Sequence, residues 1–167
     1  MKNLNKLFMF GFGDDFYINS FFEKNHLDVM HKKDFLVERA INEKKPILFF
    51  VEKHNVFIED WVCKYLEEIE NLYPFSKFIL NITKPKKAAE PEVWTTQASV
   101  LKHFIKNDQS VDKFLLSRQI PEKYGISNNL NFSDFQLKNF MLFDSDSMNP
   151  ELMESFISEG WPDDSLQ

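Results

Sequence analysis

Cysteine is nearly missing from this chain of 167 residues, since Cys63 is the only one. A single thiol excludes an internal disulfide, and the lack of paired cysteines is typical of a reducing compartment. Long apolar runs are also lacking, and Asp14 and Asp15 interrupt the first apolar stretch too early for a signal peptide. We therefore expect a cytoplasmic protein with no contact to a membrane.

Positive charge is missing from the last part of the chain, because no Lys or Arg follows Lys138. The whole chain carries a net charge of -6 at pH 7, which disfavours bulk attraction to the phosphates of nucleic acid. This charge instead suits a basic protein surface or a protein complex as partner, with nucleic acid only as a secondary contact. The acidic end is either a solvated tail or a contact surface for such a partner.

Phenylalanine, in contrast, is abundant, with 19 residues in the chain. Its ring has no polar atom to satisfy, so a chain rich in Phe builds a dry core or offers an adhesive surface. The chain is also long enough to bury a core without disulfides or metal ions. We expect one α/β domain over residues 1–143 and an acidic C-terminal segment over residues 144–167 that packs on this domain or extends from it.

Strand and helix patterns alternate along the chain. Short apolar runs predict strands at residues 7–10, 27–30, 46–51 and 75–83. Apolar residues at helical spacing predict helices at residues 14–22, 34–43, 55–72, 91–106, 133–142 and 149–157. Residues 111–120 fit either a last strand or a helix capped by Ser110. This alternation predicts a three-layer α/β fold with a mostly parallel sheet, helices on both faces, and a C-terminal acidic helical segment.

Acidic and hydroxyl side chains stand at the ends of several predicted strands. Asp14 and Asp15 follow the first strand, Glu52 follows residues 46–51, and Thr83 ends the next strand. Ligands of parallel sheets bind at the carboxyl ends of the strands, so these residues are the first place to look for chemistry. The alternative is an ordinary doubly wound sheet with an acidic rim.

This arrangement resembles the receiver domain of bacterial response regulators over residues 5–143. The resemblance implies an acidic pair that helps to hold Mg²⁺, a phosphoacceptor position at Glu52, and a lysine position approximated by Lys113 or Arg118. Glu is not the residue that this family phosphorylates, and it is one methylene longer. The resemblance therefore implies a degenerate, non-phosphorylated domain.

The remaining reactive side chains do not form a catalytic pattern in the sequence. Cys63 is expected to be a small core residue. His26 and His31 suit a loop better than a metal site, and His54 and His103 have no identifiable carboxylate partner. We therefore predict no enzymatic activity, no cofactor and no metal site.

Candidate partner-binding residues fall into a basic loop with a tryptophan after it and into the acidic end of the chain. They are Lys84, Lys86, Lys87, Trp94, Asp144, Asp146, Glu151, Glu154, Glu159, Trp161, Asp163 and Asp164. An aromatic residue flanked by charge, such as Trp161, is typical of an interface anchor.

The general style of the chain is rich in Phe, Asn and Lys, acidic, and free of motifs. It is similar to the small early proteins with which T-even-type bacteriophages redirect their host, among them a terminator of host transcription. The resemblance implies a non-enzymatic regulator that binds a protein machine such as host RNA polymerase. An acidic immunity protein or antitoxin that neutralises a basic toxin is an open alternative, as is the degenerate receiver-like domain.

Overall fold

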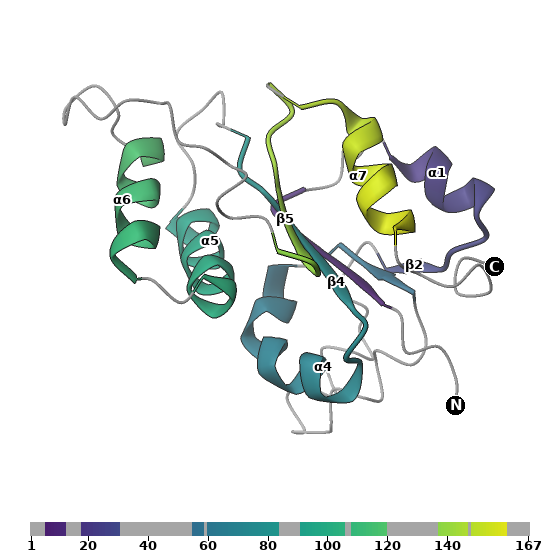
Figure 1. The fold of residues 1–167 in the computed structure, drawn as a ribbon, viewed down its shortest axis with the longest axis horizontal. Coiled ribbons are helices and arrows are strands. Elements are labelled where there is room, and N and C mark those ends of the chain that lie inside the picture. The colour runs from purple at the N-terminus through teal and green to yellow at the C-terminus, as the bar shows by residue number, and fades with distance from the viewer. Residues whose placement is uncertain are drawn as a thin grey trace.

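The computed structural model describes residues 6–12, 18–30, 55–58, 60–83, 91–105, 108–119, 137–146 and 148–159. Its elements, in chain order, are β1 (Leu7–Phe10), α1 (Asn19–Lys24), β2 (Val29–Met30), β3 (Val56–Phe57), the 3₁₀ helix η1 (Asp60–Tyr65), α4 (Leu66–Leu72), β4 (Lys77–Asn81), α5 (Pro91–Phe104), α6 (Asp108–Gln119), β5 (Phe140–Phe143) and α7 (Pro150–Ser158). Helices lie on both sides of the sheet (Figure 1). The chain is therefore an α/β protein, as its alternating pattern predicts.

The described strands form one five-stranded sheet in the order β2-β3-β1-β4-β5, and every pairing between them is parallel. β1 lies at the centre, between β3 and β4. In the 2-1-3-4-5 order of flavodoxin-like sheets, the first strand instead lies between the second and the third. Residues 46–51 and Glu52 lie outside the described residues, so the receiver-like layout stays a prediction.

Alternation along the strands divides the core into two layers. Phe8 and Phe10 of β1 face one layer, which is covered by η1, α4, α5 and α6, whereas Leu7 and Met9 face the other layer, covered by α1 and α7. In Figure 1, α1 and α7 accordingly lie together on one side of the sheet, and α4, α5 and α6 lie on the other. The strands are buried on both faces, as continuous apolar runs predict.

Phenylalanine rings fill the first of these layers. The ring of Phe8 stacks on Phe57 at 5.0 Å and on Phe78 at 5.4 Å between centroids, which joins three neighbouring strands. Phe104 of α5 continues the row, at 4.9 Å from Phe78 and 4.4 Å from Phe140. The abundant Phe thus serves a dry core in this part of the chain, where ring pairs add to the burial of apolar area.

The predicted helix over residues 55–72 is wrong in its first part. Val56 and Phe57 form β3 between β1 and β2, and the helical segment starts only at Asp60, as a 3₁₀ helix. Asn55 caps no helix here, because its backbone N–H donates to the carbonyl of Asp28 and its side chain accepts from the N–H of the same residue. Pairing with two strands buries Val56 and Phe57 almost completely, which outweighs the local helical spacing.

One further prediction is wrong near the end of the chain, and one open alternative is decided. The helix predicted to reach Leu142 is replaced by strand β5, whose four side chains are all buried between the two helical layers. For residues 111–120 the sequence leaves a strand or a helix open, and the described part of this segment belongs to helix α6, in which Ser110 lies inside the helix instead of capping it. Lys113 and Arg118 consequently lie on a helix, so neither takes the strand position of the receiver lysine.

The other described elements lie close to their predicted places. β1, β2, α5 and α7 match within a few residues, whereas β4 begins at Lys77 because Phe75 and Ser76 belong to a turn. α1 begins at Asn19 with Ile18 at the N-cap position. Asp14, the predicted cap, lies outside the described residues, as do the helix predicted at 34–43 and the loop at 121–131.

Candidate functional site

Helix α7 turns its acidic residues away from the sheet. Its apolar residues Met153, Phe156 and Ile157 are buried in the core layer that α7 shares with α1. The opposite side, which we name the acidic face of α7, consists of Glu151, Leu152, Glu154, Ser155, Ser158 and Glu159, all exposed except the half-buried Glu154. Leu152 is 50% exposed within this acidic surrounding. An exposed apolar side chain on a face that also carries carboxylates is a surface that a basic, partly apolar partner can cover.

The first turn of α7 is held by a side-chain cap. The Oδ1 atom of Asn149 accepts a hydrogen bond from the N–H of Glu151 at 3.0 Å, and Pro150 follows at the first helical position. Glu151 also places a negative charge near the helix N-terminus, where the helix dipole favours it. The start of the acidic face is therefore fixed by local sequence.

The last turn of α7 is held by a buried lysine from the sheet. The Nζ atom of Lys77 donates to the backbone carbonyls of Phe156 and Glu159 and lies 3.4 Å from that of Ile157. The same ammonium lies 5.0 Å from the centre of the Phe156 ring. A cation at a helix C-terminus satisfies carbonyls that have no partner within the helix and complements the helix dipole.

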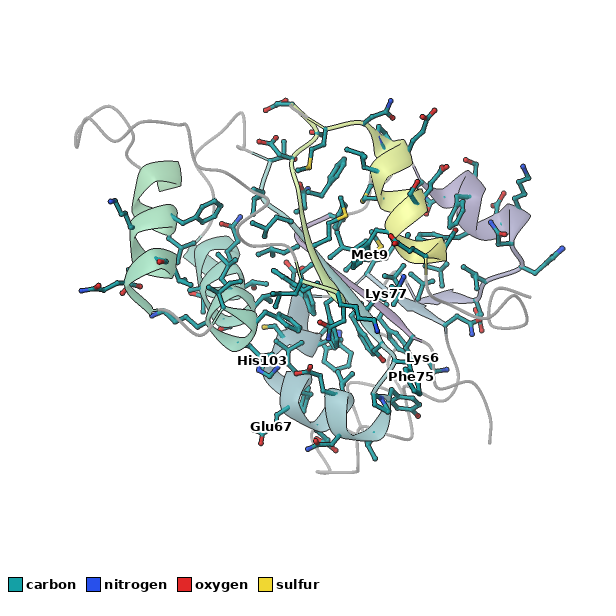
Figure 2. The ribbon with its side chains drawn as sticks, viewed as in Figure 1. Lys6, Met9, Glu67, Phe75, Lys77 and His103 are labelled. Atoms are coloured by element: carbon teal, nitrogen blue, oxygen red, sulfur yellow. The ribbon has the colours of Figure 1, made fainter. Side chains whose placement is uncertain are left out.

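The environment of Lys77 acts on its charge in two opposing ways. The residue is only 6% exposed, and this burial lowers the pKa of its ammonium to about 8, while the nearby carboxylate of Glu159 acts to raise it. In Figure 2 the side chain of Lys77 lies in the interior, below the C-terminal end of α7. Lys77 is thus the point where the sheet holds the end of the acidic face.

A second polar region lies at the carboxyl ends of β1 and β4. The helices that follow these two strands, α1 and α5, pack on opposite faces of the sheet, so the strands flank a topological switch point. Here the N–H of Gly11 donates to Asp60 Oδ1 at 2.7 Å, and Asn81 Nδ2 donates to the carbonyl of Gly11 at 2.9 Å. These bonds join the ends of both strands to the start of η1.

The same network continues to the end of β5. Thr83, predicted from the sequence to stand at a strand end, donates through its hydroxyl to Asn81 Oδ1 at 2.5 Å and accepts from the N–H of Ser145 at 2.9 Å. The side-chain amide of Asn81 thus bonds to both Gly11 and Thr83. The described polar groups at this edge mainly bond to one another, which is the arrangement of a structural clamp that ties three strand ends together.

Another polar contact joins two helices that cover the layer of Phe8 and Phe10. His103 of α5 pairs through Nε2 with Glu70 Oε1 of α4, which corrects the prediction that His103 lacks a carboxylate partner. The four-residue spacings within one helix could not reveal this pair, because its two residues lie on different helices.

Cys63 of η1 is half-buried. Its burial, and to a lesser extent the nearby charge of Asp60, raises the pKa of its thiol.

Two of the predicted partner-binding residues, Asp144 and Asp146, differ in their exposure to solvent. Asp146 is exposed, but Asp144 is only 6% exposed, and its Oδ1 accepts from the N–H of Asp146 at 3.0 Å. The carbonyl of Asp144 also accepts from the N–H of Met148 at 2.8 Å. Asp144 therefore shapes the turn between β5 and α7 instead of offering its carboxylate to a partner, because turn residues commonly bond to backbone two positions ahead.

Most of the remaining predicted site residues lie outside the part of the chain that the structure describes. Trp94 lies on α5, and its side chain is outside the description. The residues outside the described ranges are Asp14, Asp15, His31, Glu52, His54, Lys84, Lys86, Lys87, Trp161, Asp163 and Asp164. The acidic pocket and the basic loop predicted from the sequence thus stay predictions.

Sequence reasoning missed Lys77 and Phe75, which were both assigned to a strand. A lysine within a run of apolar residues is a signal for a buried charge that needs a partner. Pro74 next to Phe75 is a signal for a turn. Neither signal shows which distant group the side chain meets.

Within the described ranges, no cluster of three or more His, Cys, Asp or Glu side chains is arranged to hold a metal ion. None of the described helices combines the length and the apolar character needed to cross a membrane. No protein-family model matches the chain, and no match was found among curated proteins or solved structures.

Proposed function

We propose that this chain is a small, non-enzymatic regulator that binds a basic surface of a protein or protein complex through the acidic face of α7. The observation that carries the proposal is the division of α7 into two sides. Its apolar side is buried in the core, whereas the opposite side carries the exposed Glu151 and Glu159, the half-buried Glu154 and the exposed Leu152. The carboxylates guide a basic partner, and the exposed leucine adds apolar contact area.

The way α7 is held also supports this proposal. Asn149 fixes its first turn and Lys77 its last turn, while Met153, Phe156 and Ile157 pack into the core. A surface that is already ordered before binding avoids much of the entropy cost of association. The similarity to phage early proteins makes host RNA polymerase the first partner to test, and a basic toxin is the alternative of the same charge class.

The test is a comparison of captured partners between the wild-type chain and a variant with Glu151→Gln and Glu154→Gln. Glu151 is exposed and Glu154 is half-buried outside the core, so we expect the variant to keep its fold, which circular dichroism checks. A purified candidate partner, host RNA polymerase first, is then titrated by calorimetry. We expect about a tenfold weaker affinity for the variant and a steep loss of wild-type affinity with added salt.

The matched control is Asp112→Asn on α6, which removes an acid from the opposite face of the sheet. We expect this control to bind like the wild type. Equal binding by the α7 variant and the wild type, or an equal loss in the control, contradicts the role of α7. A captured basic nuclease that the wild-type chain inhibits would instead favour the immunity function.

A further inference from the structure

The helical segment after β3 changes its type part way along. Its first part, Asp60–Tyr65, forms the 3₁₀ helix η1 with 6 residues, and the α-helix α4 follows directly. A 3₁₀ helix longer than about three or four residues is uncommon, because its hydrogen bonds have poorer geometry than those of an α-helix. Tyr65, where the two parts meet, has a φ of −120° and a ψ of 19°, away from the α-helical values of about −63° and −42°. The length of η1 therefore needs a cause.

The residues of η1 and α4 do not supply this cause. No glycine or proline lies within Asp60–Leu72. Val62, Leu66 and Ile69 follow α-helical spacing, and all three are buried in the same core layer. A continuous α-helix would also keep them on one side, so that form is compatible with their burial. The local sequence thus favours an α-helix where the folded chain has a 3₁₀ helix, which is a conflict between local and tertiary preferences.

A hydrogen bond at the carboxyl end of β1 holds the start of η1. The N–H of Gly11 donates to Asp60 Oδ1 at 2.7 Å, and Asn81 in turn donates to the carbonyl of Gly11. A 3₁₀ helix rises about 2.0 Å per residue and an α-helix about 1.5 Å, so the 3₁₀ form of η1 spans about 3 Å more. Because Leu66 is fixed in the core at the other end, the bond to Gly11 accounts for the extended form.

η1 also contains a buried polar group without a partner. The Nε1 atom of Trp61, next to Asp60, is buried and finds no hydrogen-bond acceptor among the described residues. An unpaired buried donor lowers stability, since it has lost its bond to water. The Trp61 ring meets the Tyr65 ring edge-on, with 6.1 Å between centroids, so it contacts the joint with α4. The unpaired donor and the poorer hydrogen bonds bring a second state of this segment closer in free energy.

We propose that η1 is a conformational switch, which converts from a 3₁₀ helix to an α-helix continuous with α4 when Asp60 leaves Gly11. The conversion shortens the segment and draws Asp60 away from the carboxyl ends of β1 and β4, the edge where ligands of parallel sheets bind. Any group that takes the carboxylate of Asp60 from Gly11 at this edge triggers the switch. The inference goes beyond the proposed function, because η1 and α7 cover opposite faces of the sheet.

Asp60→Ala in the full chain tests the switch, because it removes the acceptor of the Gly11 N–H. In NMR spectra, Hα to N–H contacts between residues two apart mark a 3₁₀ helix, and contacts between residues four apart mark an α-helix. Over residues 60–65 we expect the first kind in the wild type and the second kind in the variant, with a changed amide signal of Gly11. A variant that keeps the wild-type contacts, or a wild type that is already α-helical there, overturns the inference.

Lys64→Ala is the matched control, because it raises helix propensity at an exposed position of η1 without removing the bond to Gly11. We expect this control to keep the 3₁₀ contacts of the wild type. Conversion of the control to an α-helix would assign the change to helix propensity and overturn the inference.

Hydrogen exchange of the wild type gives a second test, which does not depend on the folding of a variant. Because the hydrogen bonds of η1 open during the conversion, we expect the amides of residues 63–65 to exchange at least about tenfold faster than those of residues 69–72 in α4. Equal protection of the two groups of amides overturns the inference, even if Asp60→Ala fails to fold.

Discussion

The side chain of Lys77 at the start of β4 donates to the backbone carbonyl of Glu159 at the end of α7, 82 residues later in the chain. The lysine is buried, and the carbonyls it meets lie at the end of a helix, where they have no partner within the helix. This contact joins the central sheet to the acidic face of α7. It is the basis of two of the following predictions.

Replacing Lys77 by Met is expected to loosen the last turn of α7. The substitution leaves carbonyls of Phe156 and Glu159 without their donor, and we expect a loss of about 1–2 kcal/mol in the free energy of unfolding, measured by urea titration. Hydrogen exchange should speed up more in α7 than in β1. Lys102→Met removes an exposed ion pair with Asp112 and serves as control, with an effect below about 0.5 kcal/mol. Equal effects of both variants would contradict the role of Lys77.

The stability of the chain is expected to depend on Lys77 at alkaline pH. Burial lowers its pKa to about 8 in the folded protein, against an ordinary value of 10.5. Between these two values the unfolded chain binds a proton that the folded chain lacks, so the free energy of unfolding rises with pH across this window. Below about pH 8 both states are protonated and the contribution is constant.

The difference in unfolding free energy between the wild type and Lys77→Met isolates this effect, since other lysines and tyrosines titrate in both proteins. We expect the difference to change in favour of the wild type from pH 8 to 10.5. A difference that stays flat, or one that changes in the opposite direction, rules out a lowered pKa for Lys77.

The contact between His103 and Glu70 is expected to stabilise the packing of α4 against α5. We predict a coupling of about 0.5–1.5 kcal/mol in a double-mutant cycle of His103→Ala and Glu70→Ala, because both groups are shielded in part from water. The same cycle on Lys102 and Asp112, which are more exposed, should give a smaller coupling. The idea fails if the second cycle gives the larger value.

Gly11 is expected to resist substitution by Ala. Its φ of +79° is unfavourable for residues with a side chain, and a Cβ atom there would lie 3.0 Å from the carbonyl oxygen of Asn81. We expect Gly11→Ala to cost about 1–2 kcal/mol in the free energy of unfolding by urea titration. Glu23→Ala at an exposed position of α1 is the control and should cost little. A Gly11→Ala variant as stable as the wild type would contradict the observed backbone geometry.

Patterns confined to one element predicted their structures well. The apolar run at β1, the helical spacing of α5, and the Asn149–Pro150 start of α7 all appear where expected. The candidate site was predicted in part. The exposed acids of α7 were included, but Asp144 is buried, and the acidic pocket and the lysine loop lie outside the described residues.

The sequence by itself determined the alternating α/β character, the acidity of the last helix, and the cap that starts this helix, because periodicity, charge and capping act within a few residues. Only the tertiary structure decided that Val56 and Phe57 form a strand, that Phe140–Phe143 pairs with β4, and that Lys77 holds the end of α7. These features depend on pairing and burial between distant segments. The free energy gained from this pairing and burial cannot be predicted from the spacing of residues within one segment.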